Sequence, residues 1–429
     1  MRHLAARTDF SDTARWRRAE RPTLGESRVA EWGMFEHIVL RRAERGEPIS
    51  IGAIIEALLY YQRVHLIIDR GTLFTLIKQV GAPGVLTLLR RSDISAVYCD
   101  EILMTMTDSV GALQAHRFTA AFVSGDKASG PIHSTQDRLA FDLERLSLDK
   151  KAAHAFAKKF LGLVPVRKLS GDYFLRGGVS AAAKRDVLDT AFTKKAVRQI
   201  VSLSTCGYDP GEQFKFEVAD SDLGIYAFHN IDLDGINARR AASTPPVEPL
   251  TVAFILGQIQ EARGDLALAA FYSGDFVTSD VASAAIRIRH DEMLQRSGLN
   301  ANAREQFAEI VLPDSPRVAE VVDAGERTLK EALLLIDQAA RFKDWLKAVN
   351  PDEGLIRTYM RDVSAEGWVQ RMPVKTLRYV LTLALDATYP VAGMLAGFAD
   401  NFLVEKLLGG WRPNHFISSR FEPFVRAEQ

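Results

Sequence analysis

Apolar residues recur at every third or fourth position between residues 27 and 46, and a glycine closes this stretch. The pattern predicts a helix over 27–46. The next apolar run, at 51–62, predicts a second helix. The β-branched run at 63–69 then predicts a buried strand that ends at Asp69.

Further along, residues 71–93 are apolar on both sides of a Gly-Ala-Pro-Gly break, which predicts two helical segments. Two extended segments are expected at 94–108 and 116–126. Residues 134 to 206 have the spacing of three or four helices. The stretch 213–231 predicts a β-hairpin, because apolar and charged residues alternate in its first strand.

Paired prolines and small residues at 241–249 mark the clearest domain boundary in the chain, because they favour an extended connection. Beyond this boundary the apolar periodicity is helical. We therefore expect an α+β protein that is predominantly helical, with a small mixed β-sheet in the N-terminal half and an all-helical C-terminal half. The expected parts are a flexible basic arm at 1–24, an α+β domain at 25–240 and a helical domain at 248–429.

The composition is that of an ordinary globular protein, with 47% hydrophobic and 25% charged residues among 429. Lys plus Arg equals Asp plus Glu at 54 each, so the net charge does not support binding to nucleic acid or to an anionic membrane. The two cysteines, Cys99 and Cys206, are too few for a disulfide framework. They fit a reducing compartment, and we expect a cytoplasmic protein.

Acidic residues stand at the ends of the expected strands. Asp69 follows one strand, Asp100 and Glu101 interrupt another, and Asp232 with Asp234 follow the hairpin. Two divalent cations need several oxygen ligands to hold a phosphate for in-line attack. One hypothesis is therefore a metal-dependent phosphodiesterase or nuclease that uses Mg²⁺ or Mn²⁺. Its catalytic carboxylates would be Asp69, Asp100 and Glu101, and its metal ligands Asp69, Asp100, Asp232 and Asp234. The alternative is that these carboxylates are solvated strand ends.

The nonapeptide "HNIDLDGIN" at 229–237 offers the same two interpretations. His229, Asp232 and Asp234 could ligate a transition metal, but no second histidine lies nearby. Alternatively, Asp232 or Asp234 accepts hydrogen bonds from the free amides of a helix that begins within the nonapeptide. Gly177 and Gly178 likewise predict either a helix start or a phosphate-binding turn.

Residues 379–399 form an apolar stretch long enough to cross a bilayer. Asp386 and Pro390 stand near its middle, and an aspartate at that depth opposes insertion. The stretch predicts either two core helices bent at Pro390 or, as an alternative function, a membrane-acting effector.

Each catalytic pattern is incomplete, so the leading hypothesis is a regulatory or interaction protein. Such a protein acts through a protein partner or through its own homo-oligomer. The phosphodiesterase is the first alternative, and a membrane partner is the least supported by the sequence.

Overall fold

The fold is α+β and predominantly helical, as the sequence predicts. Two small sheets lie in the N-terminal half, and the described elements beyond residue 248 are helices apart from one strand of two residues. The predicted arm at 1–24 and the apolar stretch at 379–399 lie outside the described residues. The division into domains at 25–240 and 248–429 stays a prediction. The computed structural model describes residues 34–43, 46–122, 132–171, 173, 175–205, 208–211, 213–243, 247–349, 354–364 and 411–426.

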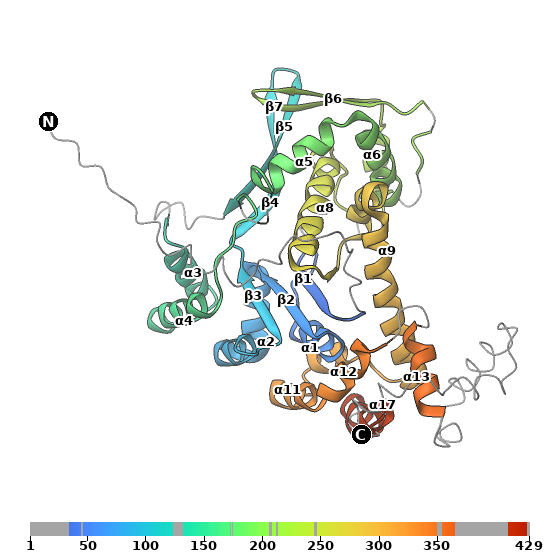
Figure 1. Cartoon of the computed structure of the whole chain (residues 1–429). Coiled ribbons are helices and arrows are strands. Elements are labelled where there is room, and N and C mark those ends of the chain that lie inside the picture. Colours follow the sequence, from blue (N-terminus) through green and yellow to red (C-terminus); the bar gives the residue numbers. More distant parts are fainter. Residues whose placement is uncertain are drawn as a thin grey trace, which may run out of the picture. The chain divides into compact units, whose positions relative to one another are not determined.

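The first sheet is parallel, with strand order β3-β2-β1-β8 (Figure 1). Its strands are β1 (His37–Arg41), β2 (Arg63–Ile68), β3 (Ile94–Tyr98) and β8 (Asp275–Phe276). Strand β2 confirms the predicted strand at 63–69. The helix predicted over 27–46 is wrong, because β1 lies within that range.

The reason for the error is that β1 is buried on both faces. Ile38 and Leu40 pack into one hydrophobic cluster, and Val39 packs into another. Such a strand is a continuous apolar run without polar alternation, and a short run of this kind cannot be told from a helix by periodicity.

The helices α1 (Ile51–Tyr60) and α2 (Arg70–Leu89) connect the parallel strands and confirm the sequence prediction. The hydroxyl of Ser50 caps α1, and the carboxylate of Asp69 caps α2. At Gly81 the backbone of α2 has a φ of 69°, so the helix is interrupted at the predicted Gly-Ala-Pro-Gly break.

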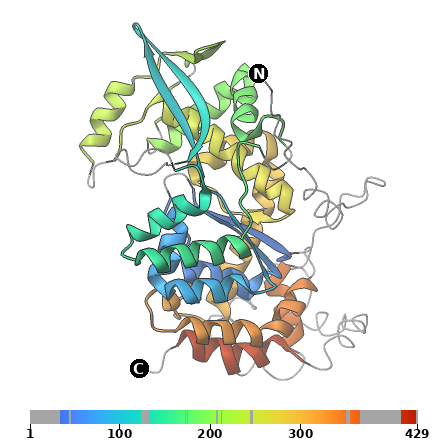
Figure 2. The ribbon, with the colours of Figure 1, turned by 90° about the vertical axis from the view of Figure 1, so that its left-hand side faces the viewer.

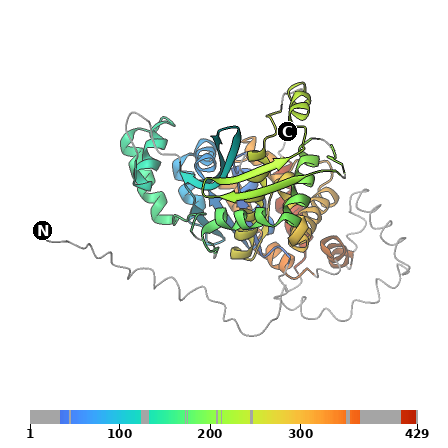
Figure 3. The same cartoon turned by 90° about the horizontal axis from the view of Figure 1, so that it is seen from above.

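The second sheet is antiparallel, with strand order β4-β5-β7-β6. Figure 3 shows β6 and β7 from above, lying over helices from the middle of the chain. The hairpins β4–β5 and β6–β7 confirm that the segments expected at 94–108, 116–126 and 213–231 are extended. The strands are β4 (Glu101–Val110), β5 (Leu113–Phe122), β6 (Phe216–Ser221) and β7 (Gly224–His229).

The remaining elements are helical, and the four helices between residues 134 and 206 confirm the prediction for that stretch. The helices of the middle of the chain are α3 (Thr135–Glu144), α4 (Lys150–Leu163), α5 (Gly178–Leu188), α6 (Thr190–Ser204), α7 (Leu233–Ala241), α8 (Val252–Tyr272) and α9 (Asp280–Val311). Those that follow are α10 (Val318–Asp323), α11 (Leu329–Gln338), α12 (Ala340–Lys347), α13 (Gly354–Ser364), α17 (Pro413–Phe416), the π-helix η5 (Ile417–Phe421) and α18 (Glu422–Val425).

Two hydrophobic clusters cover the two faces of the parallel sheet. The first joins alternate residues of β1, β2 and β3 to α1, α2, α4 and the C-terminal helices, with Trp345 and Phe416 among its members. The second joins the opposite positions, such as Val39 and Ile67, to α5, α6, α8 and the start of α9. The sheet is therefore a central layer that is buried on both faces.

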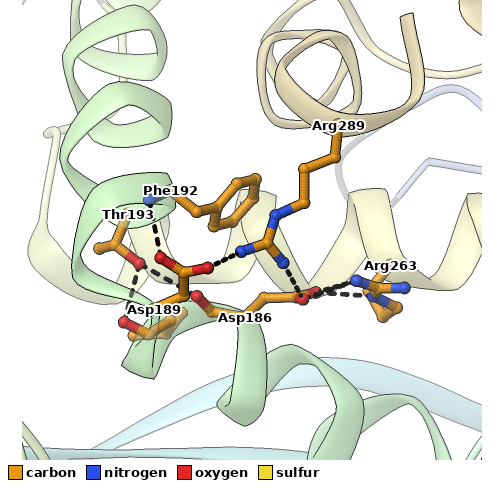
Figure 4. Close-up of polar contacts among 7 residues, drawn as sticks. Asp186, Asp189, Phe192, Thr193, Arg263 and Arg289 are labelled. Atoms are coloured by element: carbon orange, nitrogen blue, oxygen red, sulfur yellow. Dashed lines mark hydrogen bonds and ion pairs between the residues drawn. The ribbon is translucent and has the colours of Figure 1, made fainter.

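An ion-pair cluster around the buried Asp186 ties four helices together on the second face. Asp186 of α5 accepts hydrogen bonds from Nε and Nη2 of Arg263 of α8, both at 2.6 Å, and from Nη1 of Arg289 of α9 at 2.9 Å (Figure 4). Arg289 also bonds Asp189, the N-cap of α6, and its guanidinium carbon lies 4.1 Å from the ring centroid of Phe192. The cluster fixes these helices to one another because each charge has an opposite partner.

Candidate functional site

A cleft opens where the parallel strands end, and it has a volume of about 320 Å³. The carboxyl edge of a parallel sheet is the usual place for a ligand in open α/β sheets. Residues that follow β1, β2 and β3 line the cleft together with the first residues of β4. The lining residues are Arg41, Arg42, Ala43, Ile67, Asp69, Cys99, Glu101, Ile102, Leu103, Met104 and Leu169.

The cleft brings together two of the three carboxylates that the sequence nominates as catalytic, and Asp69 is the first. Its Oδ1 accepts a hydrogen bond from the backbone amide of Thr72 at 2.7 Å, which caps α2. Its Oδ2 lies 3.4 Å from Nη1 of Arg42, whose Nε donates to the carbonyl of Gly46 at 2.7 Å. Asp69 therefore has a structural partner on each carboxylate oxygen.

Glu101 is the second carboxylate in the cleft, and it is buried. Its Oε2 accepts from the backbone amide of Ser170 at 3.0 Å, and its Oε1 accepts from the Ser170 hydroxyl at 2.8 Å. The backbone of Ser170 packs closely against Gly178, since a Cβ added at Gly178 would lie 2.0 Å from the Ser170 carbonyl oxygen. These bonds fix the position of the Glu101 carboxylate.

The other polar groups of the cleft are also held by neighbours. Arg41 pairs with the buried Asp265, which also accepts from the Thr278 hydroxyl at 2.8 Å. Burial raises the pKa of Asp265, and its contacts with Arg41 and Thr278 oppose that rise. Burial likewise raises the pKa of the Cys99 thiol to about 11, so this cysteine is a neutral thiol at pH 7 and a poor nucleophile.

Asp100, the third nominated carboxylate, does not line this cleft. Its Oδ2 accepts from Nη2 of Arg138 and, at 3.3 Å, from the Thr135 hydroxyl of α3. Both members of the Asp100–Arg138 ion pair are buried. The pair joins the end of β3 to α3.

Asp232 and Asp234 lie at the start of α7. Oδ1 of Asp232 accepts from the amide of Gly235 at 2.9 Å, so the capping interpretation of the nonapeptide is confirmed. Asp234 is an acidic residue of the first turn of the same helix. Among the described residues, no group of three or more His, Cys, Asp or Glu side chains is arranged to hold a metal ion.

Gly177 and Gly178 begin α5, which confirms the helix-start interpretation of this glycine pair. The amide of Gly178 donates to the carbonyl of Leu175 at 2.8 Å, and the amide of Val179 donates to the carbonyl of Leu169 at 3.0 Å. Two amides of the first turn are therefore already occupied by backbone carbonyls.

The antiparallel sheet presents a second candidate surface. One face packs on α5, α6 and α8 and buries Leu103, His116, Phe216 and Ile225. The opposite face carries side chains of even-numbered β4 residues and of their partners in β5 and β7. We call it the exposed sheet face, defined by its exposed apolar side chains Ile102, Met106, Val110, Leu113 and Phe228.

These five side chains are 38 to 50% exposed. Val110 pairs directly with Leu113 next to the turn of the β4–β5 hairpin. Phe228 lies on the same face of β7, because Tyr226, two residues before it, pairs with Ala115 of β5. The exposed apolar side chains of this face therefore come from three strands. Figure 2 shows the β4–β5 hairpin as the long teal ribbon whose tip lies away from the helices.

This surface was not expected from the sequence. The alternation of Ile102, Met104 and Met106 in β4 is its only signal in the sequence. Alternation shows that these side chains share a face, but it does not show whether that face is covered by helices.

By length and composition alone, one described helix, α2, is apolar enough to cross a membrane. Its side chains Leu73, Leu76 and Leu88 are buried in the first hydrophobic cluster. A core helix of a globular protein passes the same test.

Comparison with protein-family models, with curated proteins and with solved structures found no match to this chain.

Proposed function

We propose that this protein is an interaction protein that acts through the exposed sheet face. The observation that supports this is the exposed pair of Val110 and Leu113, together with Ile102, Met106 and Phe228 on the same face. Several exposed apolar side chains on one face mark a binding surface, because a soluble monomer gains nothing by keeping them in water.

The local stability of the hairpin supports the same function. Residues 106–114 are exposed on both faces of the two-stranded ribbon. A two-stranded hairpin is only marginally stable in water, and a further layer over its apolar face stabilises it. A partner that covers this face therefore stabilises the hairpin and removes its exposed apolar side chains from water.

Hydroxyl-radical footprinting tests this proposal even while the partner is unidentified. Reactivity is measured in dilute purified protein and in the native cell extract. We expect Met106 and Phe228 to lose reactivity several-fold in the extract. Leu299 and Leu334, which are 66% and 56% exposed on α9 and α11, should react equally in both and are the controls. Equal reactivity of Met106 and Phe228 in both samples would contradict the proposal.

A metal-dependent phosphodiesterase remains a second candidate, because Asp69 and Glu101 line one cleft at the carboxyl edge of a parallel sheet. A thermal melt with and without Mn²⁺ tests it. A metal that binds only the folded protein stabilises it by about 2.7 kcal/mol at a hundredfold excess over its dissociation constant. The enzyme hypothesis requires a rise in melting temperature that Glu101→Gln abolishes. An unchanged melting temperature removes the support for it.

A further inference from the structure

We infer that a second copy of this chain covers the exposed sheet face, packed face to face across a two-fold axis. This inference rests on the proposed function of that face and names its partner. The interface would join the antiparallel sheets of the two copies into a two-layer sandwich.

The architecture of the sheet favours a flat partner of the same kind. Helices α5, α6 and α8 already cover the inner face, and a sheet with an apolar outer face is buried against a helix or against a second sheet. Two sheets pack about 10 Å apart with their side chains interdigitated. A two-fold axis presents the same face from both copies, so the exposed apolar side chains of one copy meet those of the other.

The charges on the exposed sheet face are compatible with self-association. Asp108 and Arg117 lie on this face, and Nη2 of Arg117 donates to Oδ2 of Asp108 across the hairpin. Because these two charges neutralise each other within one copy, this pair presents no net charge to a second copy. Glu217 of the edge strand β6, which pairs with Phe228, is a further charge on this face. The whole chain has 54 basic and 54 acidic residues, so two copies do not repel each other at long range.

The area of the face is sufficient for a dimer. The four strands have ten, ten, six and six residues. At about 3.4 Å per residue and about 4.8 Å between strands, the face covers roughly 500 Å². Two copies would then bury roughly 1,000 Å² in total, which is the lower limit for a specific interface. We therefore expect a dimer that dissociates at low protein concentration.

Sedimentation velocity of the full chain over a concentration series tests the inference. The wild-type chain should sediment at twice its monomer mass at high concentration and dissociate on dilution. Leu113→Lys and Phe228→Lys each place a charge on the exposed sheet face, and each should weaken self-association by about tenfold or more. Leu334→Lys changes an equally exposed leucine on α11 and should leave the dimer intact.

Both lysine variants should fold, because the replaced side chains are about half exposed, and an unchanged thermal midpoint of the dilute monomer verifies this. Hydrogen exchange gives a second readout on the wild-type chain. The amides of β4 between Met106 and Val110 should exchange more slowly at high protein concentration than at low concentration.

A wild-type chain that is monomeric at every concentration overturns the inference, and so does a dimer that both lysine variants leave intact. The proposed function is distinguished by the footprint. If Met106 and Phe228 are protected in the cell extract while the purified chain stays monomeric, the face has a different partner and only the self-association inference fails. If the footprint shows no protection and the chain is monomeric, both fail.

Discussion

Asp186 of α5 and Arg263 of α8 form a bidentate ion pair in which Nε and Nη2 of the arginine each donate at 2.6 Å. Arg289 adds a third bond to the same carboxylate. Neutralising Asp186 leaves two partly buried guanidinium groups without their shared counter-charge. Asp186→Asn should therefore lower the free energy of unfolding by about 3 kcal/mol, measured by urea titration.

Asp209 provides the matched control for this substitution. It receives the same bidentate contact from Nε and Nη2 of Arg198, at 2.9 and 2.7 Å, but its carboxylate is exposed. An exposed ion pair contributes little because water and salt screen it. Asp209→Asn should leave the urea midpoint unchanged. If both substitutions have the same effect, burial does not determine the strength of the Asp186 cluster.

The Asp100–Arg138 pair leads to a prediction about the connection between β3 and α3. Both side chains are buried, so removing one leaves the other with an uncompensated charge. Asp100→Ala should lower the free energy of unfolding by about 3 kcal/mol. In a double-mutant cycle with Arg138→Ala, the two residues should show a coupling energy of about 2 kcal/mol.

The control cycle uses Lys184 and Asp220, which lie 2.6 Å apart and are about 40% exposed. Their coupling energy should be below about 1 kcal/mol. Equal coupling in the two cycles would show that burial does not strengthen the Asp100–Arg138 pair.

The sequence predicted most elements of the fold because local signals specify them. Ser50, Asp69 and Asp232 stand where a helix begins, and each accepts a hydrogen bond from a first-turn amide. The break at Gly81 and the alternation in the two hairpins are equally local. The strand β8 could not be found in this way, because two residues contain no period and its pairing with β1 is a contact over more than 200 residues.

The candidate sites were harder to predict for the same reason. Strand ends could be located from the sequence, and two of the three nominated catalytic carboxylates, Asp69 and Glu101, line one cleft, whereas Asp100 does not. Their partners, Arg42 and Ser170, come from other parts of the chain and occupy the carboxylate oxygens. The sequence offers no means of counting such tertiary hydrogen bonds, and they decide whether a carboxylate is available to a ligand.

Gly178 is predicted to be essential for stability, because it packs against Ser170, the hydrogen-bond partner of Glu101. Its φ is 75°, and an added Cβ would lie 2.0 Å from the Ser170 carbonyl oxygen. Gly178→Ala should lower the free energy of unfolding by about 3 kcal/mol or more, because backbone strain and overpacking act together.

Gly111, in the turn between β4 and β5, separates these two causes. Its φ is 64°, but nothing lies within 4 Å of an added Cβ. Gly111→Ala should therefore cost only about 1 to 2 kcal/mol, from the left-handed conformation alone. A similar cost at both positions would mean that Ser170 moves freely away from Gly178.

The histidines of the parallel sheet predict how stability depends on pH. Nδ1 of His37 lies 2.8 Å from Nε2 of His65, and the His65 ring stacks on Tyr272 with 4.4 Å between centroids. Burial lowers the pKa of His65 to about 3, and the charges of His37 and Arg63 act in the same direction. His65 is therefore neutral in the folded protein at pH 7 and through the mildly acidic range.

In the unfolded chain, His65 takes up a proton near pH 6.5. Below that pH the unfolded state binds a proton that the folded state does not, so the free energy of unfolding decreases as the pH falls from 6.5 towards 3. The decrease from His65 alone should be about 1.4 kcal/mol per pH unit. His65→Phe preserves the aromatic stack and removes the titration. Urea titrations at pH 7.5 and 5.0 should show a smaller loss of stability in this variant than in the wild-type chain. Equal losses in the two proteins would mean that His65 is protonated in the folded state.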